Sequence, residues 1–229
     1  MTRVWEPAFA RLGHNPAALE ATYRWVVAAV AILALSVSTG FALVAHDIAL
    51  VVLGPKWLPA VPVIQVLTLA AGMSAITMPL ASVLGATGDP RVVLGLTLLR
   101  TTLLVAAIVP AAIWLGLTEI AMGRAIATAI SVVVALSVFE RVVGLKQLTL
   151  ARSLFRPSLA AMAMAGVVLA LQYAIAPEPA LRLAVCIVAG GPTFTAALLI
   201  LWVLAGRPAG VEHDTVALIK RRLGGMAQR

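Results

Sequence analysis

This sequence has few charged residues and one cysteine, and these shortages exclude several classes of protein. Charged residues make up 11% of the 229 residues and hydrophobic residues 62%, whereas a soluble domain has roughly 25% and 45–50%. Cys186 alone cannot form a disulfide framework or a metal cluster, so a packing role is expected for it. The histidines, His14, His46 and His213, lie in separate segments, so we expect no metal site and no cofactor.

Long apolar runs occupy most of the chain, and they predict its fold class. The six runs are 25–45, 58–87, 92–117, 120–139, 157–176 and 183–205. A helix that crosses a membrane needs about 20 apolar residues, and a backbone in hydrocarbon must satisfy its own hydrogen bonds. We therefore predict an all-α polytopic membrane helix bundle with six transmembrane helices. The predicted parts are a cytoplasmic arm (1–22), a transmembrane lobe (23–205) and a basic amphipathic cytoplasmic tail (206–229).

The basic residues are distributed unevenly between the two predicted sides. Thirteen of the seventeen lie in the arm, the tail and the loops on the same side, Arg100 and Arg124 lie inside apolar runs, and Lys56 and Arg182 lie on the opposite side. Cytoplasmic loops carry the excess of Lys and Arg. Both termini are therefore predicted to be cytoplasmic, with 46–57, 116–119 and 177–182 outside. The net charge of +8 indicates contact with anionic membrane lipids, not with nucleic acid.

Prolines and turn residues indicate where the helices begin and bend. Asn15 and Pro16 predict the start of the first transmembrane helix. Residues 1–12 have the pattern of the end of a preceding helix whose body is absent. Pro62, Pro79 and Pro110 are expected to kink their helices.

Several short patterns resemble segments of a known transporter family. They are Leu53-Gly54 with Lys56-Trp57, Ala60, Gln65 and Leu67; Pro7, Phe9, Arg11 and Leu12 before a helix start containing Tyr23; and the small-residue turn at 85–88. With these residues the chain resembles the Wzx-type lipid-linked oligosaccharide flippases of the multidrug/oligosaccharidyl-lipid/polysaccharide exporter superfamily. The resemblance is to the C-terminal half of such a protein, one lobe of a two-lobed exporter.

The resemblance implies a function and partners. The chain would flip an undecaprenyl-pyrophosphate glycan across the inner membrane for polysaccharide or lipopolysaccharide biosynthesis, and it would not be an enzyme. Its partners would be membrane lipids, the lipid-linked glycan, and an N-terminal lobe or a second copy of the chain. The pyrophosphate would need a cation in the membrane, and Arg offers a suitable fork of donors.

The two arginines in the apolar runs are the first candidates for that cation. Arg100 lies well inside its run, with Thr97 one turn away on the same face. Arg124 begins a stripe that continues with Thr128 and Ser131 at helical spacing. Each could instead be structural: Arg100 as a buried ion pair or carbonyl-bonded group, Arg124 as a side chain reaching the interface. Gln65 is a further cavity candidate, although helix–helix hydrogen bonding is the favoured interpretation for it.

Other functions compete with the flippase prediction. A membrane glycan-processing enzyme would need clustered carboxylates, but Asp47, Glu119 and Glu178 are predicted in separate short loops. A drug or cation antiporter lobe would prefer a carboxylate within the membrane, and the six apolar runs contain none. A non-transporting membrane scaffold is the third alternative.

Overall fold

The structure is a computed structural model, and it describes residues 16–86, 90–114, 116–143, 147–175 and 178–206. Every regular element in these ranges is helical, as predicted. The helices are α2 (Pro16–Ile48), a π-helical turn η2 (Ala49–Leu53), a 3₁₀ helix η3 (Pro55–Ala60), α3 (Val61–Ile76), α4 (Met78–Ala86), α5 (Pro90–Trp114), α6 (Leu117–Val143), α7 (Gln147–Ala174) and α8 (Pro179–Leu204).

Six stretches in these ranges are long and apolar enough to cross a membrane, which confirms the predicted number. They are Glu20–Leu53, Pro55–Leu84, Arg91–Ile113, Leu117–Val142, Ser153–Ala174 and Pro179–Leu204. The protein is therefore a multi-pass membrane protein. The predicted arm end at 1–12 and the predicted amphipathic tail lie outside the described residues.

Proline sets several helix starts. α2 begins at Pro16, as predicted, and α5 and α8 begin at Pro90 and Pro179. Proline suits the first helical position because its φ is already helical and its missing N–H would have no partner there. The start of α7 was predicted wrongly, at residue 157. The helix begins at Gln147 because Pro157 is accommodated inside it instead of starting it.

The predicted kink of the second transmembrane segment is a complete break. α3 ends at Ile76 and α4 begins at Met78. Pro79 has no N–H to donate to the carbonyl four residues earlier, and its ring crowds that carbonyl. Thr77, between the two helices, donates its N–H to Ser74 O at 3.2 Å and its hydroxyl to the same oxygen at 2.7 Å. The break lies in the last third of the span, seven residues before Leu84.

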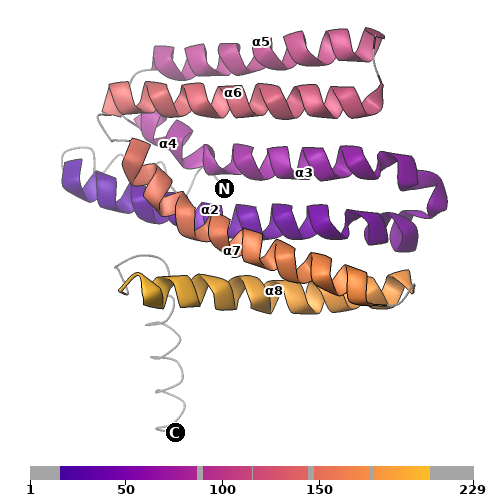
Figure 1. The fold of residues 1–229 in the computed structure, drawn as a ribbon. Helices are drawn as coiled ribbons and strands as arrows, with labels where there is room; N and C mark the ends of the chain where they lie inside the picture. Colours follow the sequence, from indigo (N-terminus) through magenta and orange to yellow (C-terminus); the bar gives the residue numbers. More distant parts are fainter. Residues whose placement is uncertain (1–15, 87–89, 115, 144–146, 176–177, 207–229) are drawn as a thin grey trace, which may run out of the picture.

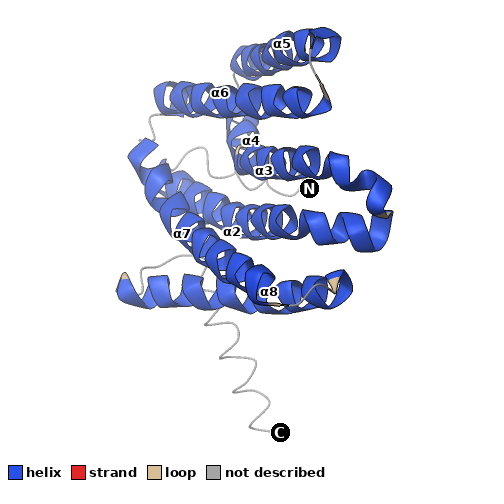
Figure 2. Ribbon diagram, turned by 45° about the vertical axis from the view of Figure 1, so that its right-hand side comes forward, coloured by secondary structure: helices blue, strands red, loops and turns tan. Residues whose placement is uncertain are grey.

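The helices form a row instead of a closed ring. α5 packs on α6, α6 on α3, α3 on α2, and α2 on both α7 and α8. α5 lies at one edge of the row and α8 at the other, and α7 crosses α2 obliquely (Figures 1 and 2). The row places the turn after α2, the α5–α6 connection and the α7–α8 connection at one end of the molecule (Figure 1).

Two apolar clusters make up most of the core. One joins α2, α4 and α6 around Tyr23 and Phe139, whose ring centroids lie 4.7 Å apart. The other joins α2, α7 and α8 around Met164 and Phe194. Gly72 of α3 lies against Ser38 of α2 so closely that an added Cβ would be 2.3 Å from the Ser38 hydroxyl oxygen. The α2–α3 contact therefore depends on the absence of a side chain at Gly72.

Candidate functional site

A partly open cavity of about 360 Å³ lies where α5, α6 and the α3–α4 break meet. Its polar lining comes from all three: Ser74 and Thr77 beside the break, Thr97, Arg100 and Thr101 on α5, and Ser131 on α6. Leucine, valine and alanine side chains make up the rest of the wall. The cavity exists because α5 packs on α6 and leaves a space beside the broken helix.

Four of the five hydroxyl groups that line the cavity, all except that of Ser74, are already hydrogen-bonded to backbone carbonyls three or four residues earlier. Thr97 donates to Val93 O at 2.8 Å, and Thr101 donates to Thr97 O at 2.9 Å. Ser131 donates to Thr128 O at 2.8 Å. These hydroxyl groups already donate their hydrogens to backbone carbonyls, but their oxygens can still accept hydrogen bonds. A ligand in the cavity would therefore find acceptors on the wall, and its strong donors would come from Arg100.

Arg100 is the one charged side chain of the cavity lining in the described part of the chain. It lies about 15 Å along α5 from Pro90, at 1.5 Å per residue. Its side chain is exposed on the protein surface, and it has no hydrogen bond or ion pair with any described residue. A charge at such depth is expensive and usually marks a pathway or a partner. The arrangement can bind an anion.

Three of the six predicted site residues come together, and three do not. Thr97, Arg100 and Ser131 line the cavity. Arg124 is exposed on α6, seven residues from Ser131 and so about 10 Å further along the helix. Thr128 is buried and does not line the cavity. Gln65 lies elsewhere, and its side chain donates to Ala42 O of α2 at 3.1 Å, which is the helix–helix role favoured for it.

Ser74, Thr77 and Thr101 were not predicted as site residues. Ser74 and Thr77 reach the cavity because the helix breaks between them and Pro79. Pro79 was a signal for the break, since a proline inside a helix disturbs the preceding turn. Thr101 follows Arg100 directly and lies one turn from Thr97, so its position on the same face was available from the spacing.

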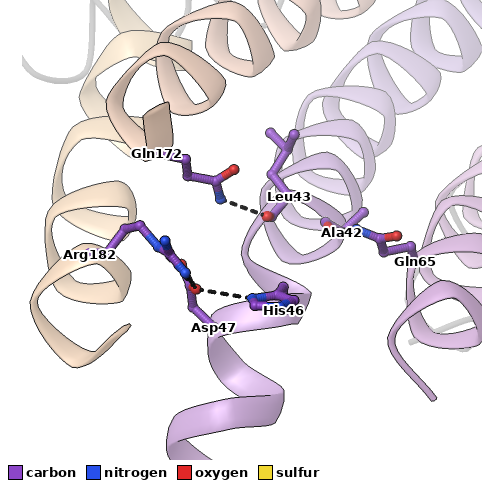
Figure 3. A network of polar contacts seen from close by, with 7 residues as sticks. All are labelled: Ala42, Leu43, His46, Asp47, Gln65, Gln172 and Arg182. Carbon is purple, nitrogen blue, oxygen red and sulfur yellow. Dashed lines mark hydrogen bonds and ion pairs between the residues drawn. The ribbon is translucent and has the colours of Figure 1, made fainter. Parts of the chain in front are cut away.

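A second polar cluster joins α2 to α8 at the end of the molecule where α2 leads into η2 (Figure 3). Arg182 Nε lies 3.1 Å from Asp47 Oδ1 and 2.9 Å from Oδ2, and its Nη2 also bonds Oδ1. The Asp47 side chain is 2% exposed and that of Arg182 21%. His46 Nδ1 lies 3.4 Å from Asp47 Oδ1. The cluster is a nearly buried, bidentate ion pair.

This ion pair corrects two predictions. Asp47 and Arg182 were placed in outer loops, but Asp47 lies within α2 and Arg182 in the first turn of α8. The prediction that the membrane segments contain no carboxylate was also wrong. The first apolar run was ended at residue 45, before Asp47, whereas the helical span continues to Leu53. Asp47 and Arg182 can lie within helices because each neutralises the charge of the other. Gln172 of α7 adds a hydrogen bond to Leu43 O at 2.8 Å (Figure 3).

Comparison with known proteins gives one similarity. Residues 1–62, which include α2 and its following turn, match the model of a family described as "Polysaccharide biosynthesis protein". Neither the curated proteins nor the solved structures contain a match to the chain. The similarity links this multi-pass membrane protein to polysaccharide biosynthesis.

Proposed function

We propose that the chain is one lobe of a transporter that moves a lipid-linked oligosaccharide across the inner membrane for polysaccharide biosynthesis. The single observation that supports this most strongly is Arg100, a cation without a protein partner among the described residues, in a cavity within the membrane. The similarity of residues 1–62 to polysaccharide biosynthesis proteins supports the substrate class. Transport, and not covalent chemistry, is the proposed activity.

In this proposal each part of the substrate meets a matching environment. Arg100 donates to the pyrophosphate, for which the guanidinium fork is well suited. The oxygens of Thr97, Thr101 and Ser131 accept hydrogen bonds from sugar hydroxyls. The lipid tail stays in the bilayer, so the protein has to provide a polar path for the head alone. The cavity is partly open, which lets a tail remain outside while the head enters.

The proposal includes a second lobe that completes the path. The cavity is bounded by α3–α4, α5 and α6 alone, so one bundle supplies one wall. A second bundle, on the same polypeptide or on another chain, would supply the other wall. Two lobes rocking about a site near the middle of the membrane is the general arrangement of such transporters, whose sites are often formed at broken helices.

Both termini are proposed to be cytoplasmic. The turn after α2, the α5–α6 connection and the α7–α8 connection lie at one end of the molecule (Figure 1), and this end is proposed to be outside. The excess of basic residues in the remaining segments supports the assignment of the other end to the cytoplasm.

The antiporter and enzyme alternatives have weaker support. An antiporter would need a carboxylate free to bind a proton or a metal cation, but Asp47 is bidentately paired with Arg182. An enzyme would need acids close together. Glu119 instead accepts the Gly116 N–H at 3.0 Å and so caps the start of α6.

The test is export in a flippase-deficient strain that also produces an N-terminal lobe. Arg100→Ala should reduce surface glycan roughly tenfold or more, because a hydrogen bond to a charged group contributes about 1.5–3 kcal/mol. Arg100→Lys should restore part of the export, since Lys keeps the charge but loses the bidentate geometry. Arg124→Ala is the matched control, an exposed arginine on a membrane span outside the cavity, and it should export normally.

The amount of protein in the membrane must be measured for each variant. Normal export by Arg100→Ala, or equal losses from Arg100→Ala and Arg124→Ala, would refute the assigned role. Loss of the Arg100→Ala protein from the membrane would mean that the arginine is structural.

A further inference from the structure

An apolar groove of about 540 Å³ lies between α2 and α8, with α7 as its floor. Its lining contains no charged residue. All of its residues belong to membrane spans. We call it the α2–α8 groove. Its volume lies within the roughly 300–1,000 Å³ of small-ligand sites, so it can hold one flexible chain.

The walls of the groove suit a hydrocarbon ligand. Gly40, Gly190 and Gly191 line it and leave space where other residues would place side chains. An added Cβ at Gly191 would meet nothing within 4 Å. The two exposed hydroxyls have spent their donors within their own helices, Ser36 on Leu33 O and Thr195 on Gly191 O. The groove therefore offers shape and apolar contact, with neither lining hydroxyl left to donate to a polar ligand.

The Asp47–Arg182 ion pair does not line the groove, but it lies about one helical turn beyond the lining residues Val44 and Cys186. Cys186 and Gly190 line the groove, and Arg182 precedes them on the same stripe of α8, at spacings of four. On α2, Val44 and Gly40 line the groove, one and two helical turns before Asp47. The pair uses Nε and Nη2 of Arg182, while its Nη1 donates to no described residue. An arginine has five N–H donors, so Arg182 has donors left for an anion at the mouth of the groove.

We propose that the α2–α8 groove is a phospholipid site, with one acyl chain in the groove and the lipid phosphate on Arg182. In the membrane the groove must be filled, because an empty apolar space loses the contacts of its lining, and the surrounding material is lipid chains. The remaining arginine donors select a lipid with an anionic phosphate at this end. A transmembrane helix, about 10–12 Å across, could cover the groove but could not enter it.

The site is independent of the Arg100 cavity. It is formed by α2, α7 and α8, whereas the cavity is formed by α3–α4, α5 and α6. Its failure would therefore leave the transport proposal untouched. The lipid would fill the α2–α7–α8 contact and keep α8 in place beside α2.

The test is photolabelling in vesicles of phosphatidylethanolamine and phosphatidylglycerol. The probe is a phosphatidylglycerol with a diazirine on one acyl chain, and labelled residues are located by mass spectrometry. In the unaltered protein, label should concentrate on the groove faces of α2 and α8. Ile187→Trp should reduce this label by roughly fivefold or more, because the ring would occupy the space of the chain.

Val188→Trp is the matched control. Ile187 and Val188 are neighbours on α8, both apolar and well exposed, but only Ile187 lines the groove. Label in Val188→Trp should stay near the original level. If Ile187→Trp does not fold, Thr195→Leu fills the groove from the same helix further along. Equal label in the groove-filling and control variants, or no groove label in the unaltered protein, would overturn the site and point to coverage by another helix.

A second probe tests the phosphate contact. A diacylglycerol with the same photoreactive chain and no phosphate should label the groove roughly tenfold less, because it cannot accept hydrogen bonds from Arg182 as an anion does. Equal labelling by the two probes would overturn the role of Arg182. Competition by polyprenyl phosphate, but not by phosphatidylglycerol, would overturn the choice of a phospholipid as the occupant.

Discussion

Arg182 and Arg100 lie on two sides of the molecule and differ in whether a protein group binds their guanidinium. On the α2–α7–α8 side, Arg182 is paired with Asp47, and Gln172 donates to a carbonyl of another helix. On the α5 side, Arg100 has no described partner, and the threonines beside it bond to their own helix. Arg182 and Gln172 therefore join helices on one side, whereas on the other side Arg100 is open to a ligand.

The two sides also differ in how many of their residues are buried. α2, α7 and α8 share a buried cluster around Met164 and Phe194. In α5, by contrast, Ala111 is the one buried residue among the side chains that the structure describes. An edge helix with few buried contacts opens at lower free energy than a central one. The comparison predicts that changes on the α2 side alter stability, and that changes on α5 alter transport.

The largest loss of stability should follow Arg182→Ala. It leaves the Asp47 carboxylate buried without its cation, and breaking a buried pair in this way costs about 3–5 kcal/mol. Thermal unfolding of the purified protein in detergent measures it. The double variant Asp47→Asn/Arg182→Gln should recover much of the loss, because it leaves no uncompensated charge. A loss of stability no larger than that of Arg124→Ala would contradict the claim that the Arg182–Asp47 pair holds α2 and α8 together.

Gly72→Ala should be the next most damaging change, at about 1–3 kcal/mol for an overpacked contact. Its new Cβ would lie 2.7 Å from Ser38 Cβ and 3.3 Å from Ala34 O, and Ser38 is buried. Adding Ser38→Gly should restore the stability. Gly95→Ala on α5 is the control, since nothing lies within 4 Å of a Cβ there. Equal unfolding midpoints for Gly72→Ala and Gly95→Ala would show that α2 and α3 are less closely packed.

A smaller effect is expected from the glutamines that join helices to α2. Gln172→Leu and Gln65→Leu each remove one bond to a carbonyl, and such bonds in membrane proteins average about 0.6 kcal/mol. Each variant should lower the free energy of unfolding by roughly that amount, measured by denaturant titration in mixed micelles. Losses of several kcal/mol would mean that these bonds, and not the ion pair, dominate the contact.

The smallest change in stability is expected from Arg100→Ala. The arginine has no hydrogen bond or ion pair with a described residue that its removal would break, and it is costly to keep within the membrane. The unfolding midpoint should stay the same or rise slightly, even though export falls. A clear drop in the unfolding midpoint would show that Arg100 has a structural partner. Arginines would then stabilise the protein on both sides of the molecule.

The sequence was sufficient for the fold class but not for the pairing of distant residues. The apolar runs predicted the six spans, and Pro16 predicted the start of α2, because these depend on local composition. The Asp47–Arg182 pair joins residues 135 positions apart, and nothing local indicates that they meet. The α3–α4 break was signalled by Pro79, but a kink and a complete break cannot be distinguished from a single proline.

The candidate site was predictable where a single helix decides it. Thr97 and Arg100 share a face of α5 by spacing alone. Arg124, Thr128 and Ser131 were predicted as one stripe of α6, and of the three only Ser131 lines the cavity. Which part of a polar stripe meets a cavity depends on the neighbouring helices, and so on packing that one sequence does not specify.

The most direct test of the central claim is water access to position 100. Arg100→Cys, made with Cys186→Ala, would be treated in native membranes with a hydrophilic thiol reagent, and Val109→Cys, an exposed position on α5 outside the cavity, would be the lipid-facing control. If Arg100 lies on a polar path, Arg100→Cys should react readily and Val109→Cys should stay unreactive. A third variant, Thr97→Cys, retains Arg100. Inorganic pyrophosphate should slow its reaction with a positively charged thiol reagent. Arg100→Cys and Val109→Cys that are equally unreactive would show that position 100 faces lipid, and that the cavity is not a transport path.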